Sequence, residues 1–242
     1  MKMHLVIDCG NTLMKAGLFD ENRNLKGPVI IDKEETLDSY IRSNNITSAI
    51  IASVIKEKTF VSKILKENSI PFLNIDSQTN LPFKNHYKTP ETLGADRIAS
   101  VSGGIYFLGN GPFLTINAGS CITYNLVDDN NAFVGGAISP GVNMRFKSMH
   151  DYTSALPLEQ PVETAPEYGK NTSESLIVGT ITGIRNEIQG FIEHWTKKFP
   201  GLRCVLGGGD ASLIQKGMNI QLQPEPNLNL YGALKILEHN ET

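Results

Sequence analysis

Short apolar runs separated by turn residues dominate the first part of the chain. Leu5-Val6-Ile7 and the run at residues 16–19, joined by a polar turn, predict a β-hairpin whose first strand is buried. Further patterns predict strands at residues 29–31 and 49–52 and helices at residues 35–42 and 59–67. The expected order is strand, strand, strand, helix, strand, helix.

The second part of the chain repeats this order. Apolar runs at residues 113–116, 122–127 and 133–138 predict three successive strands. Helical patterns follow at residues 142–150 and 173–199, and then come an apolar strand at 204–206 and a short helix at 211–215.

The repeat extends to single residues. In each copy a strand runs into a polar turn with a glycine, and a second strand follows: Ile7-Asp8-Cys9-Gly10-Asn11-Thr12 and Ile116-Asn117-Ala118-Gly119-Ser120-Cys121. Two copies of one βββαβα-like unit favour an α/β fold of the duplicated actin-like type (ribonuclease H-like, ASKHA), with two facing halves and a central cleft. We expect residues 1–111 to form the N-terminal half and residues 112–242 the C-terminal half.

The composition is that of an ordinary folded protein and restricts the class of partner. The 242 residues are 40% hydrophobic and 19% charged, with a formal net charge of -3, and the pI is about 6.0. No run of lysine or arginine is longer than Lys197-Lys198, so the sequence predicts no basic surface for nucleic acid.

The N-terminus and the cysteines indicate the compartment. Three apolar residues precede Asp8, too short a run for a signal-peptide core or a membrane span. Cys9, Cys121 and Cys204 lie far apart, and the histidines lack zinc-binding spacing. We therefore expect a cytoplasmic protein with reduced cysteines, no membrane partner and no transition-metal site.

The turn after the first strand carries groups suited to phosphate. Gly10 lets backbone N–H groups face an anion, Asn11 and Thr12 add donors, and Lys15 follows. Asp8 is a suitable ligand for a hydrated Mg²⁺ that bridges phosphates. An Asn/Gly hairpin turn beside a buried strand gives the same pattern. The second copy of the loop favours function, because two such loops facing each other would form an ATP site.

The second loop differs from the first at its acid. Gly119 and Ser120 are small enough to approach phosphate, but Asn117 stands where a carboxylate is expected. An amide is a poorer cation ligand than a carboxylate, and an Asn in a turn commonly makes a local hydrogen bond to the backbone instead.

A second acid lies just before a predicted helix. Gly94-Ala95-Asp96-Arg97 precedes the helical pattern at residues 98–108, where an Asp is commonly only a cap. The functional interpretation makes Asp96 a general base for a substrate hydroxyl, while Arg97 holds an anionic group. Phosphoryl transfer depends mainly on positioning and charge neutralisation, so one carboxylate suffices.

Other glycine-containing segments match no complete nucleotide motif. The run at residues 135–141 is a strand exit where small residues permit close packing or a ligand. Residues 169–172 lack the leading glycines of a P-loop and carry Asn171 at its Ser/Thr position. Residues 207–210 fail the dinucleotide fingerprint because position 212 is serine, and in an actin-like protein they would border the nucleotide base.

In their order and spacing these motifs resemble the type III pantothenate kinases over nearly the whole chain. The motifs are Asp8-Cys9-Gly10-Asn11-Thr12 with Lys15, Gly94-Ala95-Asp96-Arg97, the run at residues 135–141, Leu156-Pro157, Gly169-Lys170-Asn171-Thr172 and Gly207-Gly208-Gly209-Asp210. The resemblance implies a dimeric actin-like enzyme that phosphorylates pantothenate with ATP, the first step of coenzyme A synthesis. It also implies Mg²⁺ and a monovalent cation, K⁺ or ammonium.

The resemblance further implies a role for each matching residue. The residues implied in ATP contact are Asp8, Cys9, Gly10, Asn11, Thr12, Leu13, Met14, Lys15 and Ser120, with Asp8 also holding Mg²⁺. The residues implied in the pantothenate pocket are Tyr87, Gly94, Ala95, Asp96, Arg97 and Thr172, with Asp96 as the proton acceptor.

The chain departs from the family pattern in the second loop. Family members usually have Asp-x-Gly-Thr there, with the Asp on the monovalent cation, whereas this chain has Asn117, and Asn125 also replaces a frequent acid. Loop carbonyl oxygens would then have to compensate at the cation site. The alternative functions are a non-catalytic ligand-binding or regulatory relative, and an actin-like kinase of another small alcohol.

Overall fold

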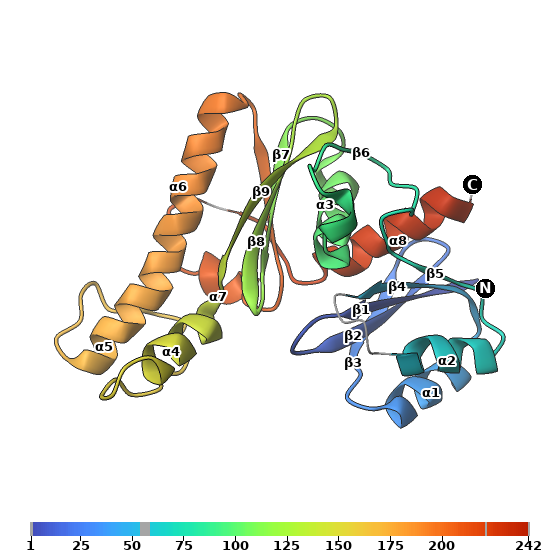
Figure 1. Cartoon of the computed structure of the whole chain (residues 1–242), viewed down its shortest axis with the longest axis horizontal. Coiled ribbons are helices and arrows are strands. Elements are labelled where there is room, and N and C mark those ends of the chain that lie inside the picture. The colour runs from blue at the N-terminus through green and yellow to red at the C-terminus, as the bar shows by residue number, and fades with distance from the viewer. Residues whose placement is uncertain (1, 54–58, 221, 242) are drawn as a thin grey trace. The chain divides into compact units, whose positions relative to one another are not determined.

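A computed structural model describes residues 2–53, 59–220 and 222–241 of the chain. The chain divides into two compact units (Figure 1). The first comprises residues 1–109 together with residues 227–242, and the second comprises residues 110–226. Each unit is an α/β structure with its own sheet. Throughout the described residues, every helix is too short or too polar to cross a lipid bilayer.

The sheet of the first unit has strand order β3-β2-β1-β4-β5. Its strands are β1 (Met3–Cys9), β2 (Met14–Asp20), β3 (Leu25–Ile30), β4 (Ile46–Ser53) and β5 (Phe72–Asn74). β1, β2 and β3 pair antiparallel, whereas β4 runs parallel to β1 and β5 runs parallel to β4. The central strand β1 is almost entirely buried because helices cover both faces of the sheet.

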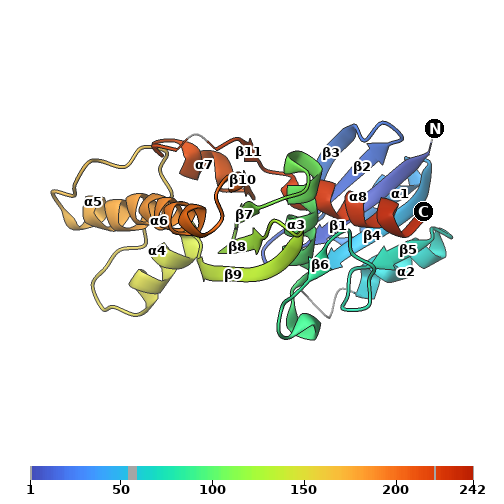
Figure 2. The ribbon, with the colours of Figure 1, turned by 90° about the horizontal axis from the view of Figure 1, so that it is seen from above.

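Alternation along β1 assigns each side chain to one face of this sheet. Leu5, Ile7 and Cys9 belong to a core cluster with apolar residues of α1 (Glu34–Arg42) and α2 (Thr59–Glu67). The intervening residues, Asp8 among them, point to the opposite face. That face is covered by α3 (Ala95–Leu108) and α8 (Leu228–Glu241), which lie side by side (Figure 2). Shorter elements of the same unit are β6 (Lys84–Asn85) and η1 (Pro90–Thr92).

α3 and α8 cross at very close range. A Cβ added to Gly232 would lie 1.8 Å from the carbonyl oxygen of Ala99, which no side chain tolerates. The contact sets where the first turn of α8 lies over the sheet. It also explains why α8 packs with the first unit although it ends the chain.

The second unit has the sheet order β11-β10-β7-β8-β9. Its strands are β7 (Phe113–Ala118), β8 (Cys121–Val127), β9 (Ala132–Pro140), β10 (Arg203–Gly207) and β11 (Pro224–Glu225). Its helical elements are α4 (Val142–Asp151), α5 (Thr172–Ile177), the π-helical turn η2 (Val178–Thr182), α6 (Gly183–Lys198) and α7 (Ala211–Gln215). One face of the sheet packs on these helices through a core that includes Ile116, Tyr124 and Ile184.

The two sheets repeat one topology, which confirms the predicted duplicated fold class. In each, three antiparallel strands are followed by two parallel ones. The turns repeat as well. The carboxylate of Asp20 accepts hydrogen bonds from the N–H groups of Asn22 and Asn24, and that of Asp128 accepts from Asn130 and Ala132, all at 2.9 Å.

The structure departs from the sequence expectations in several places, besides the short elements β5, β6, η1 and β11 that were not expected. The helical stretch expected at residues 173–199 is present but interrupted by η2. α8 was not expected at all, since its buried positions surround the helix and give no amphipathic pattern. The expected C-terminal half began at residue 112 and included the whole remaining chain, whereas residues 227–242 pack in the first unit.

Candidate functional site

The first loop joins β1 to β2 through a tight turn. The N–H of Gly10 donates to the carbonyl oxygen of Leu13 at 3.0 Å. Asn11, Thr12 and Leu13 are exposed at the tip. Cys9 and Met14 are buried in the core, so they can contribute to a ligand only through their backbone.

Asp8 stands at the carboxyl end of β1, opposite Lys15 on β2. Burial raises the pKa of Asp8 to about 6; a hydrogen bond from Asn229 opposes the rise, the nearby Asp96 adds to it, and Lys15 opposes it. The Nδ2 of Asn229 donates to Oδ2 of Asp8 at 3.4 Å. A carboxylate whose negative charge is disfavoured by burial is well suited to a cation, which would compensate that charge.

Asp96 lies in the first turn of α3, whose N-cap is Gly94. Burial raises the pKa of Asp96, against the opposing effects of the Arg97 backbone N–H and the Arg97 charge. The N-cap of this helix is Gly94 and not Asp96, although the Asp96 carboxylate interacts with the N–H of Arg97 in the first turn. Asp96 lies near enough to Asp8 for its charge to add to the raised pKa of Asp8.

Arg97 and Tyr87, two residues of the predicted pocket, are in contact. Nη1 of Arg97 donates to the hydroxyl of Tyr87 at 3.4 Å, and the guanidinium lies 5.4 Å from the centre of the Tyr87 ring. Arg97 is only 6% exposed. A buried guanidinium beside an aromatic ring is suited to bind a carboxylate or phosphate in a defined orientation.

The second loop, between β7 and β8, is held between two glycine-containing segments. A Cβ at Gly141 would lie 2.0 Å from the carbonyl oxygen of Gly119, and a Cβ at Gly208 would lie 2.2 Å from that of Ala118. The N–H of Gly141 donates to the carbonyl oxygen of Ser120 at 3.1 Å, and the N–H of Asp210 donates to that of Ala118 at 3.1 Å. The glycine motifs therefore shape this loop.

Side chains of α4 and α6 fix one of these segments. Glu187 accepts hydrogen bonds from the hydroxyls of Tyr124 and Ser139 at 2.7 and 2.6 Å, and it is paired with Arg145 at 2.5 Å. Nε of Arg145 also donates to the carbonyl oxygen of Pro140 at 2.9 Å. The backbone just before Gly141 is thereby anchored to the helical layer.

Asn117 lies on a polar strip of the second sheet. It pairs in register with Thr123, and the neighbouring Thr115 pairs with Asn125. The Nδ2 of Asn125 donates to Oγ1 of Thr115 at 3.2 Å, so this amide takes part in a side-chain hydrogen bond. The Oγ1 of Thr123 is buried and has no partner among the described residues.

Thr172 is exposed at the start of α5 in the second unit. The preceding Asn171 is the N-cap, its side chain accepting from the N–H of Glu174 at 2.9 Å, and Glu174 accepts from the N–H of Lys170 at 2.7 Å. This reciprocal capping explains the motif at residues 169–172 without a phosphate, in agreement with the rejection of a P-loop.

Asn229 is the site residue that sequence reasoning missed. It lies in the first turn of α8, 221 positions after Asp8, and belongs to none of the recognised motifs. The one available signal was an amide between two leucines, Leu228 and Leu230, in an otherwise apolar stretch.

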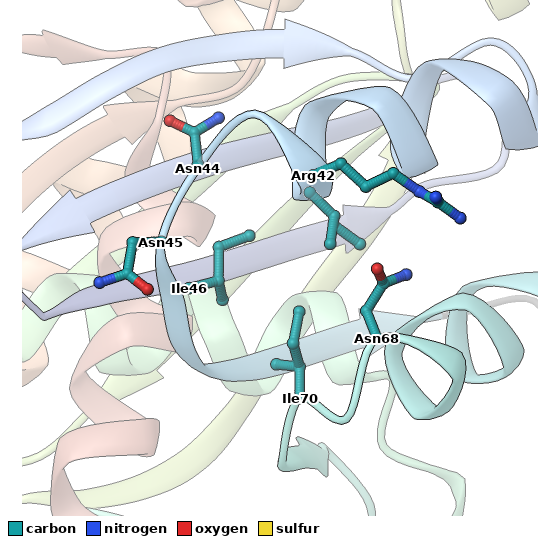
Figure 3. Close-up of a pocket in the computed structure, with 7 residues that line it drawn as sticks. Arg42, Asn44, Asn45, Ile46, Asn68 and Ile70 are labelled. Carbon is teal, nitrogen blue, oxygen red and sulfur yellow. The ribbon is translucent and has the colours of Figure 1, made fainter.

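A hollow in the first unit lies away from these residues (Figure 3). It has a volume of about 350 Å³ and is lined by residues that include Ile41, Ile46, Asn68 and Ile70. Ile46 begins β4 and pairs with the first residue of β1, so the hollow lies at the sheet edge opposite Asp8. The Nδ2 of Asn68 already donates a hydrogen bond to the carbonyl oxygen of Ile64 at 2.9 Å. The hollow therefore offers little for a ligand.

Solved structures share the fold of the chain. A Campylobacter jejuni protein whose description places it with the Baf family transcriptional activators is 22% identical, covers 98% of each chain and has a TM-score of 0.62. A ROK family glucokinase from Streptomyces griseus is 10% identical, covers 96% of this chain and 97% of its own, and has a TM-score of 0.51. At these identities the likeness concerns the fold alone.

Sequence comparison identifies the family. A curated relative from Christiangramia forsetii, named type III pantothenate kinase, is 38% identical over 245 residues, covering 99% of this chain and 100% of the relative. The family model described as type III pantothenate kinase matches residues 4–194. This match includes both loops, Asp96 and Arg97. The chain belongs to the type III pantothenate kinase family.

Proposed function

We propose that the chain transfers the γ-phosphoryl group of ATP to the hydroxyl of pantothenate, giving 4'-phosphopantothenate in the first step of coenzyme A synthesis. The observation that carries this proposal is the pair of acids Asp8 and Asp96, near enough for Asp96 to affect Asp8 and both in surroundings that raise their pKa. One acid adjoins a turn suited to phosphate, and the other adjoins a buried guanidinium.

The first loop is our proposed site for ATP and Mg²⁺. Asp8 offers carboxylate oxygens, which are the ligands that Mg²⁺ prefers, so the residues present fit the metal. When bound, Mg²⁺ would neutralise charge on the phosphates. Asn11 and Thr12 have exposed side chains that can donate to phosphate oxygens, and Lys15 adds a positive charge on the neighbouring strand. Ser120 of the second loop is a further proposed ATP contact.

Asp96 is the proposed general base. A carboxylate whose pKa is raised by burial accepts a proton from an alcohol more readily than an ordinary one. Arg97 would bind the carboxylate of pantothenate and thereby orient the reacting hydroxyl. The hydroxyl of Tyr87 accepts a hydrogen bond from this guanidinium. The first N–H groups of α3, at Gly94 and Ala95, have no intrahelical acceptor. Thr172 stays a proposed contact of the pantothenate pocket.

The monovalent cation is proposed to bind weakly. Asn117 supplies a neutral oxygen instead of a carboxylate, so electrostatic attraction for K⁺ or ammonium is reduced. The unpartnered hydroxyl of Thr123, opposite Asn117 in the sheet, is a second oxygen at the same position. We expect K⁺ or ammonium to stimulate the enzyme only at high concentration.

A homodimer without nucleic-acid or membrane partners is also part of the proposal. Ile138 on β9 is 60% exposed and Met144 on α4 is 42% exposed, which is unusual for large apolar side chains on neighbouring elements. The net charge of -3 argues against a polyanionic partner.

ADP release from the purified protein tests the proposal. The protein is mixed with Mg²⁺-ATP and pantothenate in buffers that contain K⁺, ammonium or only Na⁺. Release that requires pantothenate, and that glucose does not replace, supports the kinase. Stimulation by K⁺ or ammonium supports the cation site at Asn117, whereas equal rates in Na⁺ indicate that the site is lost. Binding of ATP without release in any buffer would favour the non-catalytic relative.

A further inference from the structure

Asn229 has a buried side-chain amide, of which the Nδ2 group has a hydrogen-bond partner among the described residues and the Oδ1 atom has none. The residue is 8% exposed and lies in the first turn of α8. Its Nδ2 donates to Oδ2 of Asp8 at 3.4 Å. Its Oδ1 is buried and has no hydrogen-bond partner among the described residues.

The unpartnered Oδ1 lowers the stability of the folded protein unless a ligand supplies a hydrogen-bond donor. A buried acceptor without a partner destabilises the folded protein, and the other residues buried in this turn are the apolar Leu228 and Leu230. A leucine at position 229 would fill the same space without that cost. Unsatisfied buried groups in native proteins call for an explanation, and an absent ion or water is one of the commonest.

The surroundings select the kind of ligand. The Nδ2 of the amide donates to the Asp8 carboxylate, whose negative charge attracts a cation. Mg²⁺ usually keeps several of its waters in a protein site, and those waters are hydrogen-bond donors. An amide oxygen beside a metal-binding carboxylate is a suitable acceptor for one of them.

We propose that Asn229 is a positioning residue of the metal site, with its N–H group holding Asp8 in place and its Oδ1 accepting a hydrogen bond from a water of the Mg²⁺ ion. The inference rests on the proposed function, in which Asp8 holds that ion. Partners of this kind orient the ligand and raise metal affinity about 10- to 100-fold.

Asn229→Leu tests the role, because it removes both hydrogen-bonding groups and keeps the branched shape of the side chain. ADP binding is measured by calorimetry with EDTA and then with Mn²⁺, and the ratio of the two affinities gives the metal enhancement. We expect the enhancement to fall at least tenfold, with ADP affinity in EDTA within twofold of the unmodified protein. The matched control is Asn240→Ala on the same helix, where Nδ2 donates to the carbonyl oxygens of Asn80 and Ile236; it should retain the full enhancement.

The outcomes separate the two proposals. A normal enhancement in a folded Asn229→Leu variant would overturn the role of Asn229 and leave the proposed function standing. An unmodified protein whose ADP affinity does not respond to Mn²⁺ would instead contradict the metal site at Asp8. If Asn229→Leu fails to fold, Asn229→Ala is measured in the same way and decides the question by the same criterion.

Discussion

Two half-buried acids, Asp8 and Asp96, are the proposed reactive groups at the scale of single residues. Asp8 faces the helical layer because it alternates with Ile7 and Cys9 along β1, and Asp96 begins the helix that covers the same face. The sequence already indicated both acids, since each lies two residues from a glycine at one end of a secondary-structure element. Their proximity depends on tertiary packing and could not be obtained from local pattern.

Replacement of the proposed base should leave binding intact and slow the reaction. Asp96→Asn removes the proton acceptor but keeps the size of the side chain, so kcat is expected to fall by about two to four powers of ten. The KM for ATP should change little. Steady-state rates of ADP formation provide the measurement, with Asp38→Asn, on the exposed surface of α1, as the control that keeps full activity. A near-normal kcat for Asp96→Asn would refute the role.

At the scale of elements, close backbone contacts position the second loop. Gly141 begins α4 and Gly208 follows β10, and both touch carbonyl groups of the loop between β7 and β8. The glycine motifs that contain Gly141 and Gly208, each of low specificity in the sequence, therefore belong to one local structure around this loop. A glycine pattern alone is compatible with either tight packing or ligand approach, so the sequence left this point open.

A methyl group at Gly141 should disturb the loop. In Gly141→Ala the new Cβ would overlap the carbonyl oxygen of Gly119, and such overpacking typically costs about 1–3 kcal/mol. We expect a lower melting temperature and a higher KM for ATP. Gly190→Ala is the matched control, because no atom lies within 4 Å of its added Cβ and alanine should stabilise α6 by about 0.5–1 kcal/mol. Equal behaviour of the two variants would contradict this explanation.

The sequence predicted helices that have one apolar face, but it did not reveal a helix that is buried over most of its surface. α1 and α2 each have one apolar face, and the short helix α7 was expected with its observed bounds. α8 is buried over most of its surface and contains Gly232, so neither amphipathicity nor propensity indicated it. Asn229 was missed for the same reason, since it lies on an element that the pattern did not reveal.

For the whole molecule, we expect the charge of Asp8 to lower the free energy of unfolding when no metal is bound. The pKa of Asp8 rises from 3.8 to about 6 on folding, chiefly through burial. The native state therefore binds more protons than the unfolded state within this window, and the free energy of unfolding falls as pH rises through it. Above pH 6 the full cost is present, and at 1.36 kcal/mol per pKa unit it is about 3 kcal/mol.

Removal of this charge should stabilise the protein and abolish its activity. In EDTA at pH 8, Asp8→Asn is expected to raise the free energy of unfolding by about 2–3 kcal/mol, with much less gain at pH 4. Urea unfolding at the two pH values measures the effect. Asp20→Asn should act in the opposite direction, because hydrogen bonds from Asn24 lower the pKa of Asp20 and its charged form stabilises the native state. An Asp8→Asn variant that is less stable at pH 8 would contradict the prediction.

The position of α8 in the first unit has a consequence for biosynthesis. During translation, residues 110–226 leave the ribosome as an uninterrupted segment and form a unit that needs no later part of the chain. The first unit can complete its folding only after residues 227–242 have been synthesised, because α8 covers one face of the sheet built around β1. The loop that is synthesised first, with Asp8 at its start, is thus among the last parts of the protein to reach its final surroundings, and a nascent chain cut short near its C-terminus would lose the environment of that carboxylate.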